Sequence, residues 1–266
     1  MGKASREGWR VAGESLRDAS DRVTLDVSET LSLDALRGAI TRRQPDVLII
    51  SAHGAVANRR NVAGIVVGHE LVLGPGLGPL PPVVVLSACH VAPRGAGTVS
   101  VTDLLLREGA VAVLGTQVPV NVRRNAMLTG RFLIYLVEVL AGREPHLTLL
   151  DAWHRAQSSN AVNDVLSGST SLSKWGMSAA PSGLPVITEF MRVRATGRLR
   201  TGHVYADTEQ VLAEIADDQG KGERIRNWFT NPGYVPESLF YVLAGRPERV
   251  FVRSVIDTLE ASSVAN

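Results

Sequence analysis

VVVLSACHVAPRG, residues 83–95, is an apolar run that ends on the single cysteine of the chain. The β-branched residues of Val83–Leu86 predict a buried strand, whereas Pro93 and Gly95 predict a loop. Cys89 therefore falls at the tip of the strand. A lone cysteine at such a position is either an inert part of the core or a nucleophile that the strand holds in place, and the surrounding sequence has to separate these interpretations.

Strand and helix patterns alternate on both sides of this stretch. The expected order is a strand at 22–26, a helix from Ser32 that stops before Pro45, a strand at 47–50, a hairpin at 61–73, the strand at 83–86, a helix at 98–109, a strand at 110–116 and helices at 121–141 and 147–157. Ser100 and Asp103 have the spacing of a helix-capping box. Such alternation is typical of an α/β fold with a mostly parallel central sheet and helices on both faces.

The C-terminal third of the chain has a different pattern. Residues 163–176 are small and polar, which predicts a flexible loop. Two strand-like segments follow, at 186–194 and 249–254, and two helical segments, at 207–218 and 222–229. We therefore expect a main domain at 1–184 and a C-terminal α+β extension at 185–266 that packs on it.

The composition excludes several classes of function. The formal net charge is +2, and the lysines and arginines are scattered, so nothing favours direct binding of nucleic acid. The most apolar helical stretch, 131–141, carries Glu138 and is shorter than the roughly 20 residues that span a bilayer, so no membrane segment is expected. A single cysteine and an N-terminus without an apolar core predict a reducing, cytoplasmic location.

Neither a metal nor a cofactor is expected. His69 and Glu70 lack the second histidine of a zinc motif four residues on. The glycines of GPGLGP, residues 74–79, are only loosely like a phosphate-binding loop, because no helix start follows them and prolines intervene. A doubly wound nucleotide-binding domain is accordingly the weakest of the functional hypotheses.

A histidine follows the strand at 47–50 much as Cys89 follows its own strand. The carboxyl ends of parallel strands line one edge of a sheet, so we expect His53 and Cys89 to lie there together. A nearby imidazole lowers the pKa of a thiol and later protonates the leaving amine. Gly54 permits close approach of the backbone, and its N–H and that of Cys89 are candidates for an oxyanion hole.

These segments also carry a family resemblance. ISAHGA at 50–55, VVVLSAC at 83–89, LLLREGAVAVLGTQVPVN at 104–121 and DAWHRAQ at 151–157 resemble the CHAT domain, a bacterial branch of the caspase-like cysteine peptidases that include separase. The resemblance implies a caspase-like sheet and a His–Cys dyad that cleaves peptide bonds, here His53 and Cys89. It also implies a dedicated protein substrate, such as a gasdermin or another defence effector, and activation by a sensor.

The chain departs from the family pattern in two places. Many relatives follow the nucleophile with a CETG-like turn, whereas this chain has His90 and VAPRG. The next loop, usually LWPVDD, reads QVPVN, with Val118 in place of tryptophan and Asn121 in place of aspartate. In caspase-like enzymes this loop lies beside the substrate main chain, so the candidate substrate-binding residues of the cleft wall are Gln117, Val118, Pro119 and Val120.

The leading hypothesis is a cytoplasmic cysteine endopeptidase that cleaves a protein or peptide substrate. No helical repeat precedes the domain in this sequence, so we expect any regulatory or sensor part to be a separate protein or to lie outside the given sequence. Cys89 is the expected nucleophile and His53 the expected acid and base, and no third catalytic residue is assigned. The alternative is a caspase-like pseudoenzyme that binds a partner without cutting it, which the altered loops favour and the intact dyad opposes.

Overall fold

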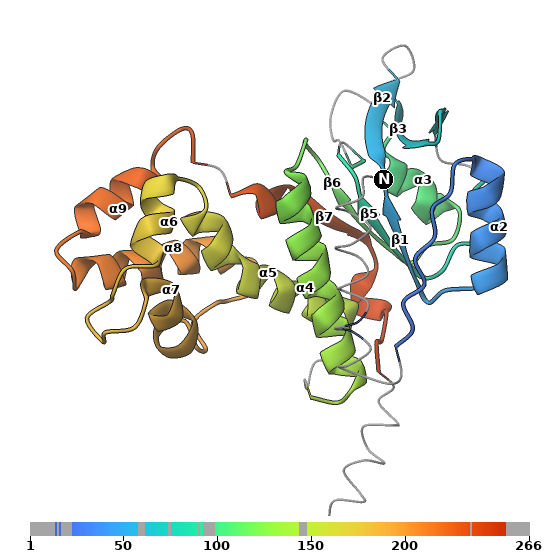
Figure 1. The fold of residues 1–266 in the computed structure, drawn as a ribbon. Coiled ribbons are helices and arrows are strands. Elements are labelled where there is room, and N and C mark those ends of the chain that lie inside the picture. Colours follow the sequence, from blue (N-terminus) through green and yellow to red (C-terminus); the bar gives the residue numbers. More distant parts are fainter. Residues whose placement is uncertain are drawn as a thin grey trace, which may run out of the picture. The chain divides into compact units, whose positions relative to one another are not determined.

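The computed structural model describes residues 14, 16, 23–57, 62–73, 76–89, 91–92, 99–143, 148–234 and 236–253 (Figure 1). The chain divides into two compact units. The first, called here the sheet unit, comprises residues 1–153 and 240–266, and the second, the helical unit, comprises residues 154–239. Residue 184, where the sequence predicts a domain boundary, lies inside the helical unit.

A four-stranded sheet forms the centre of the sheet unit. Its strands are β1 (Val47–Ser51), β5 (Val83–Ser87), β6 (Ala112–Thr116) and β7 (Tyr241–Gly245), in the order β1-β5-β6-β7. The first three strands are parallel, and β7 runs antiparallel to β6. The mostly parallel sheet is therefore as the sequence predicts, while β7 is an addition from the C-terminal part of the chain.

Helices cover both faces of this sheet (Figure 1). On one face, α2 (Leu33–Arg43) and α3 (Val101–Arg107) share a core with alternate strand residues such as Val84 and Leu86. The intervening residue Val85 points to the other face, because side chains alternate along a strand, and it is also buried. There α4 (Val122–Leu140) contacts β5, and its fully buried Phe132 packs edge-on against Trp153 with ring centroids 5.5 Å apart.

Helices α2 and α3 begin where the sequence places them. Ser32 caps α2, and Ser100 forms with Asp103 the predicted capping box of α3. In contrast, the strand predicted at 22–26 is wrong, since the described residues 23–31 have no regular structure.

A second sheet, antiparallel and three-stranded, carries the candidate histidine. It consists of β2 (His53–Ala57), β3 (Val62–Val67) and β4 (Glu70–Val72). His53 is thus the first residue of a strand and not part of a loop, and it pairs with Val66 of β3. Only Ala52 separates β1 of the main sheet from β2, so the chain passes from one sheet to the other at this residue.

The helical unit corrects several predictions for the C-terminal part of the chain. Its elements are most of α5 (Leu149–Leu166), α6 (Thr170–Gly176), α7 (Val186–Glu189), the π-helix η1 (Phe190–Arg194), α8 (Val204–Asp217), α9 (Gly222–Phe229) and most of the 3₁₀ turn η2 (Glu237–Phe240). The helices at 207–218 and 222–229 are confirmed. The loop predicted at 163–176 is wrong, because it forms the end of α5 and α6, and so is the strand at 186–194.

Helical packing explains the error at 186–194. Val186 and Phe190 are four positions apart and fully buried in a core that also includes Leu212 and Ile215 of α8. No strand occurs among the described residues of this unit, which form helices and one isolated bridge between Ala179 and Pro185. The α+β character predicted for the extension is therefore not observed there.

Residues after the helical unit rejoin the main sheet through β7, followed by the 3₁₀ turn η3 (Pro247–Arg249). Of the strand predicted at 249–254, the described residues contribute only a bridge between Phe251 and Thr148. The strand prediction there is wrong for these residues.

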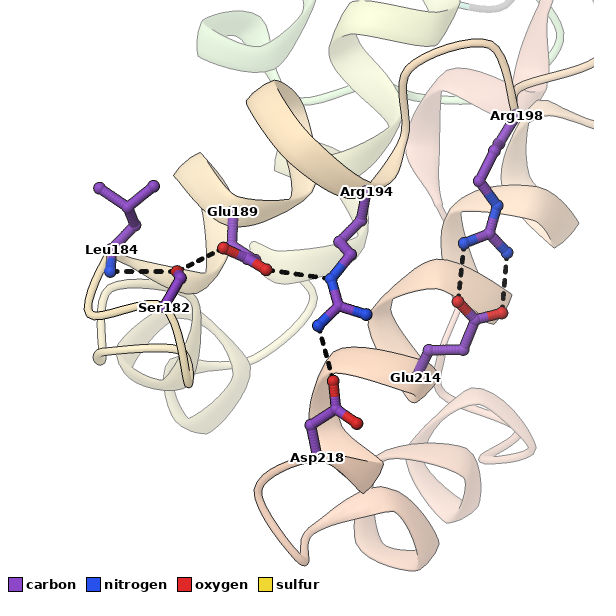
Figure 2. A network of polar contacts seen from close by, with 7 residues as sticks. All are labelled: Ser182, Leu184, Glu189, Arg194, Arg198, Glu214 and Asp218. Carbon is purple, nitrogen blue, oxygen red and sulfur yellow. Dashed lines mark hydrogen bonds and ion pairs between the residues drawn. The ribbon is translucent and has the colours of Figure 1, made fainter.

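Ion pairs connect η1 to the end of α8 within the helical unit (Figure 2). The carboxylate of Glu189 accepts hydrogen bonds from the hydroxyl of Ser182 and from Nε of Arg194, the latter at 3.0 Å. Arg194 also donates to Asp218 at 2.7 Å. The Ser182 hydroxyl and the Arg194 guanidinium lower the pKa of Glu189, so this carboxyl group remains charged although only 3% of its side chain is exposed.

Among the described helices, none combines the length and the apolar content that crossing a membrane requires.

Candidate active site

Cys89 lies just beyond the carboxyl end of β5, two residues after Ser87. Val84 and Val85 are fully buried and hold the strand in the core, whereas the side chain of Cys89 is only half-buried. Its sulfur contacts the main chain of Val120: the Val120 N–H donates to Sγ at 3.4 Å, and Sγ lies 3.8 Å from the Val120 carbonyl oxygen. The thiol is thus at the rim of the core and not sealed inside it.

The segment that carries His53 packs directly on the backbone of Cys89. A Cβ atom added to Gly54 would lie 1.5 Å from the Cys89 carbonyl oxygen and 2.7 Å from its carbonyl carbon, so only glycine fits at this position. His53, the residue before it, has an exposed side chain. The structure therefore brings the His53–Gly54 segment to the cysteine, although in the described part of the chain no hydrogen bond joins the imidazole to Sγ.

The predicted cleft wall follows β6 and reaches the cysteine. The Gln117 amide donates to the carbonyl of Phe240 at 2.9 Å, which fixes the start of this loop beside β7. Val118 is half-buried and Pro119 is exposed, while Val120 makes the two contacts with the thiol. Of the four predicted residues, Val120 is therefore the one that the structure places against Cys89.

A buried amide supports the cysteine strand from α4, and the sequence analysis missed it. Asn125 is only 6% exposed, and its Nδ2 donates to the hydroxyl of Ser87 at 2.9 Å. Thr129, also buried, donates to Oδ1 of Asn125 at 3.4 Å. A signal was present in the sequence, because Asn125 occupies the same face of the helix as the apolar Leu128 and Phe132.

Two further points concern metals and the residues that follow the cysteine. Within the described ranges, no three histidine, cysteine or acidic side chains are grouped so as to hold a metal ion. His90, Pro93 and Gly95 lie outside the described residues.

Comparison with known proteins gives the family. The family model of the CHAT domain matches residues 4–183, which is more than half of the chain. Neither the curated proteins nor the solved structures include a match. CHAT domains are generally of the cysteine-protease type and caspase-like, and the mixed α/β sheet unit is consistent with such a fold. The chain therefore belongs to the CHAT domain family.

Proposed function

We propose that the protein is a cysteine endopeptidase in which Cys89 is the nucleophile and His53 the acid and base. The observation that carries this proposal is the backbone contact between Gly54 and Cys89, which places the histidine segment of one sheet on the cysteine segment of another. Family membership supports the same chemistry. Partial exposure of the thiol supports it as well, because a nucleophile has to meet its substrate.

In the proposed reaction, the imidazole of His53 takes the thiol proton and Sγ of Cys89 attacks the carbonyl carbon of the scissile peptide bond. The negative charge that develops on the carbonyl oxygen is stabilised by the N–H groups of Gly54 and Cys89. His53 then gives its proton to the leaving amine, and a thioester remains on the enzyme. Attack by water, with His53 again as base, releases the acid product and restores the thiol.

The Cys89 amide is suited to the oxyanion role. It donates no backbone hydrogen bond to another described residue. A donor that is already engaged would have to break its bond before serving a substrate oxygen, and among the described residues this N–H has no backbone bond to break.

The proposed substrate is a protein whose main chain passes along Gln117, Val118, Pro119 and Val120. Following the family resemblance, we propose a dedicated partner such as a defence or cell-death effector in a bacterial cytoplasm, and activation by a partner or sensor. The exposed imidazole, which makes no hydrogen bond to the thiol among the described contacts, is consistent with a dyad that is completed only on activation.

Cleavage of a proteome-derived peptide library, with the products identified by mass spectrometry, tests the proposal. The parent protein should produce defined cleavages, and Cys89→Ala and His53→Ala should each abolish them while circular dichroism remains unchanged. If both variants cut as well as the parent protein, the proposed mechanism is wrong.

The second candidate, a non-cutting scaffold, is favoured by one observation: the thiol contacts of the described residues go to the main chain of Val120. Alkylation by iodoacetamide separates the two functions, because Cys89 is the only cysteine and each adduct in an intact mass spectrum reports on it. A peptidase dyad predicts faster alkylation at neutral pH in the parent than in His53→Ala. Equal and slow alkylation of both proteins in any activated state would favour the scaffold.

A further inference from the structure

We propose that Thr116 is a positioning residue that orients the amide of Cys89 toward the substrate oxyanion. This inference rests on the proposed peptidase function and adds to it a residue outside the His–Cys dyad. Thr116 is the last residue of β6, and it is fully buried. It lies next to the segment that carries the nucleophile, and it binds that segment on both sides of Cys89.

The first bond is made by the side chain. The hydroxyl of Thr116 donates to the carbonyl oxygen of Ala88 at 2.6 Å, in a buried environment. The second is made by the main chain, where the carbonyl oxygen of Thr116 accepts a hydrogen bond from the Ala92 amide at 2.8 Å. One residue thus holds both the residue before the cysteine and a residue shortly after it.

The neighbouring residue of β6 allows this close approach. A Cβ atom added to Gly115 would lie 2.8 Å from the methyl group of Thr102, 3.2 Å from the side chain of Val91 and 3.3 Å from Cβ of Ala92. The Thr102 amide also donates to the carbonyl of Val91 at 3.3 Å. The segment after Cys89 is therefore packed against β6 and the start of α3.

The hydrogen bond to the Ala88 carbonyl also sets the direction of the Cys89 N–H, because both groups belong to one peptide unit. The carbonyl of Ala88 and the N–H of Cys89 belong to the same planar group, and no described peptide bond is cis. In a trans peptide the N–H points away from the C=O, so a hydroxyl that fixes the oxygen of Ala88 also fixes the direction of the Cys89 N–H. A donor on that carbonyl also polarises the peptide and strengthens its N–H as a donor.

The matched variants are Thr116→Val, which removes the hydroxyl and keeps the β-branched shape, and Thr116→Ser, which keeps the hydroxyl. Loss of a direct oxyanion donor costs about 10²–10³-fold in kcat. We expect misorientation of the donor in Thr116→Val to lower kcat by roughly 10–100-fold with KM nearly unchanged, because the oxyanion exists only in the transition state. Thr116→Ser should restore most of kcat.

The rate at which the thiol is alkylated distinguishes a misoriented Cys89 amide from a general distortion of the active site. The reaction of a thiolate with iodoacetamide forms no oxyanion, so Thr116→Val should be alkylated within about twofold of the parent rate if the hydroxyl acts through the Cys89 amide. Thr208→Val is the control, since it also removes a buried hydroxyl that donates to a main-chain carbonyl, that of Val204 at 2.7 Å, and it should leave kcat unchanged.

Hydrogen exchange makes the outcome independent of peptidase activity. The Ala92 amide keeps its main-chain acceptor in Thr116→Val, so exchange there reports on how firmly the segment around Cys89 is held once the bond to Ala88 is lost. It should be faster in Thr116→Val than in the parent and unchanged in Thr116→Ser; if Thr116→Val does not fold, Thr116→Ala carries the same test. If the parent cleaves and Thr116→Val has the same kcat, the positioning role is overturned. A loss of kcat in Thr116→Val that is not restored in Thr116→Ser overturns it as well. If the parent does not cleave in any activated state, the proposed function fails, and unchanged exchange at the Ala92 amide of Thr116→Val then overturns the positioning role as well.

Discussion

Gly54 and Cys89 touch backbone to backbone: a Cβ atom at position 54 would lie 1.5 Å from the carbonyl oxygen of Cys89. This contact joins the antiparallel sheet, which begins at His53, to the parallel sheet, which delivers the cysteine. A hydrogen atom is the only side chain that fits between the two segments. The position of the imidazole relative to the sulfur therefore depends on a residue that has no side-chain chemistry of its own.

The first prediction concerns this contact. Gly54→Ala should abolish peptide cleavage and lower the melting temperature, because the methyl group can be accommodated only if β2 moves away from Cys89. Gly130→Ala is the matched control: it lies in α4 with no atom near its added Cβ, and alanine there should stabilise the protein by roughly 0.5–1 kcal/mol. Full activity of Gly54→Ala would show that the contact does not position the site.

The second prediction concerns the support of β5 by α4. Asn125→Ala should lower the free energy of unfolding by about 1–3 kcal/mol, because it leaves the hydroxyl of Ser87 without its partner in a part-buried site. Combining it with Ser87→Ala in a double-mutant cycle should give a coupling energy of about 0.5–1.5 kcal/mol by urea denaturation. Strictly additive effects would mean that the hydrogen bond contributes nothing.

The third prediction compares two arginines of the helical unit that are drawn in Figure 2. Arg194→Ala should destabilise the protein more than Arg198→Ala. The former leaves Glu189, 3% exposed, without its cation, whereas Glu214, the partner of Arg198, is 38% exposed and can be hydrated. An exposed ion pair contributes about 0–1 kcal/mol to the free energy of unfolding, and a loss of this size is expected for Arg198→Ala. Thermal unfolding of the two variants checks the order, and the reverse order would contradict it.

The fourth prediction concerns acid. Hydrogen bonds from the guanidinium and the main-chain amide of Arg200 lower the pKa of Asp207 to about 2. In the unfolded chain the Asp207 carboxyl has an ordinary pKa of about 4 and binds a proton more readily than in the folded protein. The stabilisation from its ionised form is therefore complete above about pH 4 and is lost as the pH falls toward 2.

Asp207→Asn should therefore flatten the decline in stability between about pH 4 and pH 2, measured by urea denaturation at each pH. Asp34→Asn is the control, since the side chain of Asp34 is 91% exposed on α2. An equal decline in the parent and in Asp207→Asn would show that the pair with Arg200 does not govern the acid response.

The sequence was sufficient for elements with strong local signals. The capping box of Ser100 and Asp103 marks the start of α3, and the apolar runs before Ser51 and Ser87 mark two parallel strands. The backbone contact between Gly54 and Cys89 is in keeping with the pattern, because β1 and β5 are parallel and end at the same edge.

Elements that depend on distant partners could not be predicted. Val186–Arg194 is rich in β-branched residues, yet the burial of Phe190 and the bond between Glu189 and Arg194 favour a helical backbone. Strand β7 is five residues long and pairs with β6, although a helical unit of more than eighty residues lies between the two strands in the sequence. No local sequence pattern indicates a pairing over such a separation. Thr116 and Asn125 were missed because their roles consist of contacts across the fold.

The single residue Ala52 between β1 and β2 has a mechanical consequence. His53 opens the small antiparallel sheet, Cys89 follows β5 of the central sheet, and a single residue joins β1 of the central sheet to β2. The antiparallel sheet shares its core with the central sheet, because Ile65 of β3 and Val84 of β5 are buried in one hydrophobic cluster, so a displacement of the backbone that carries the imidazole would disturb that cluster as well.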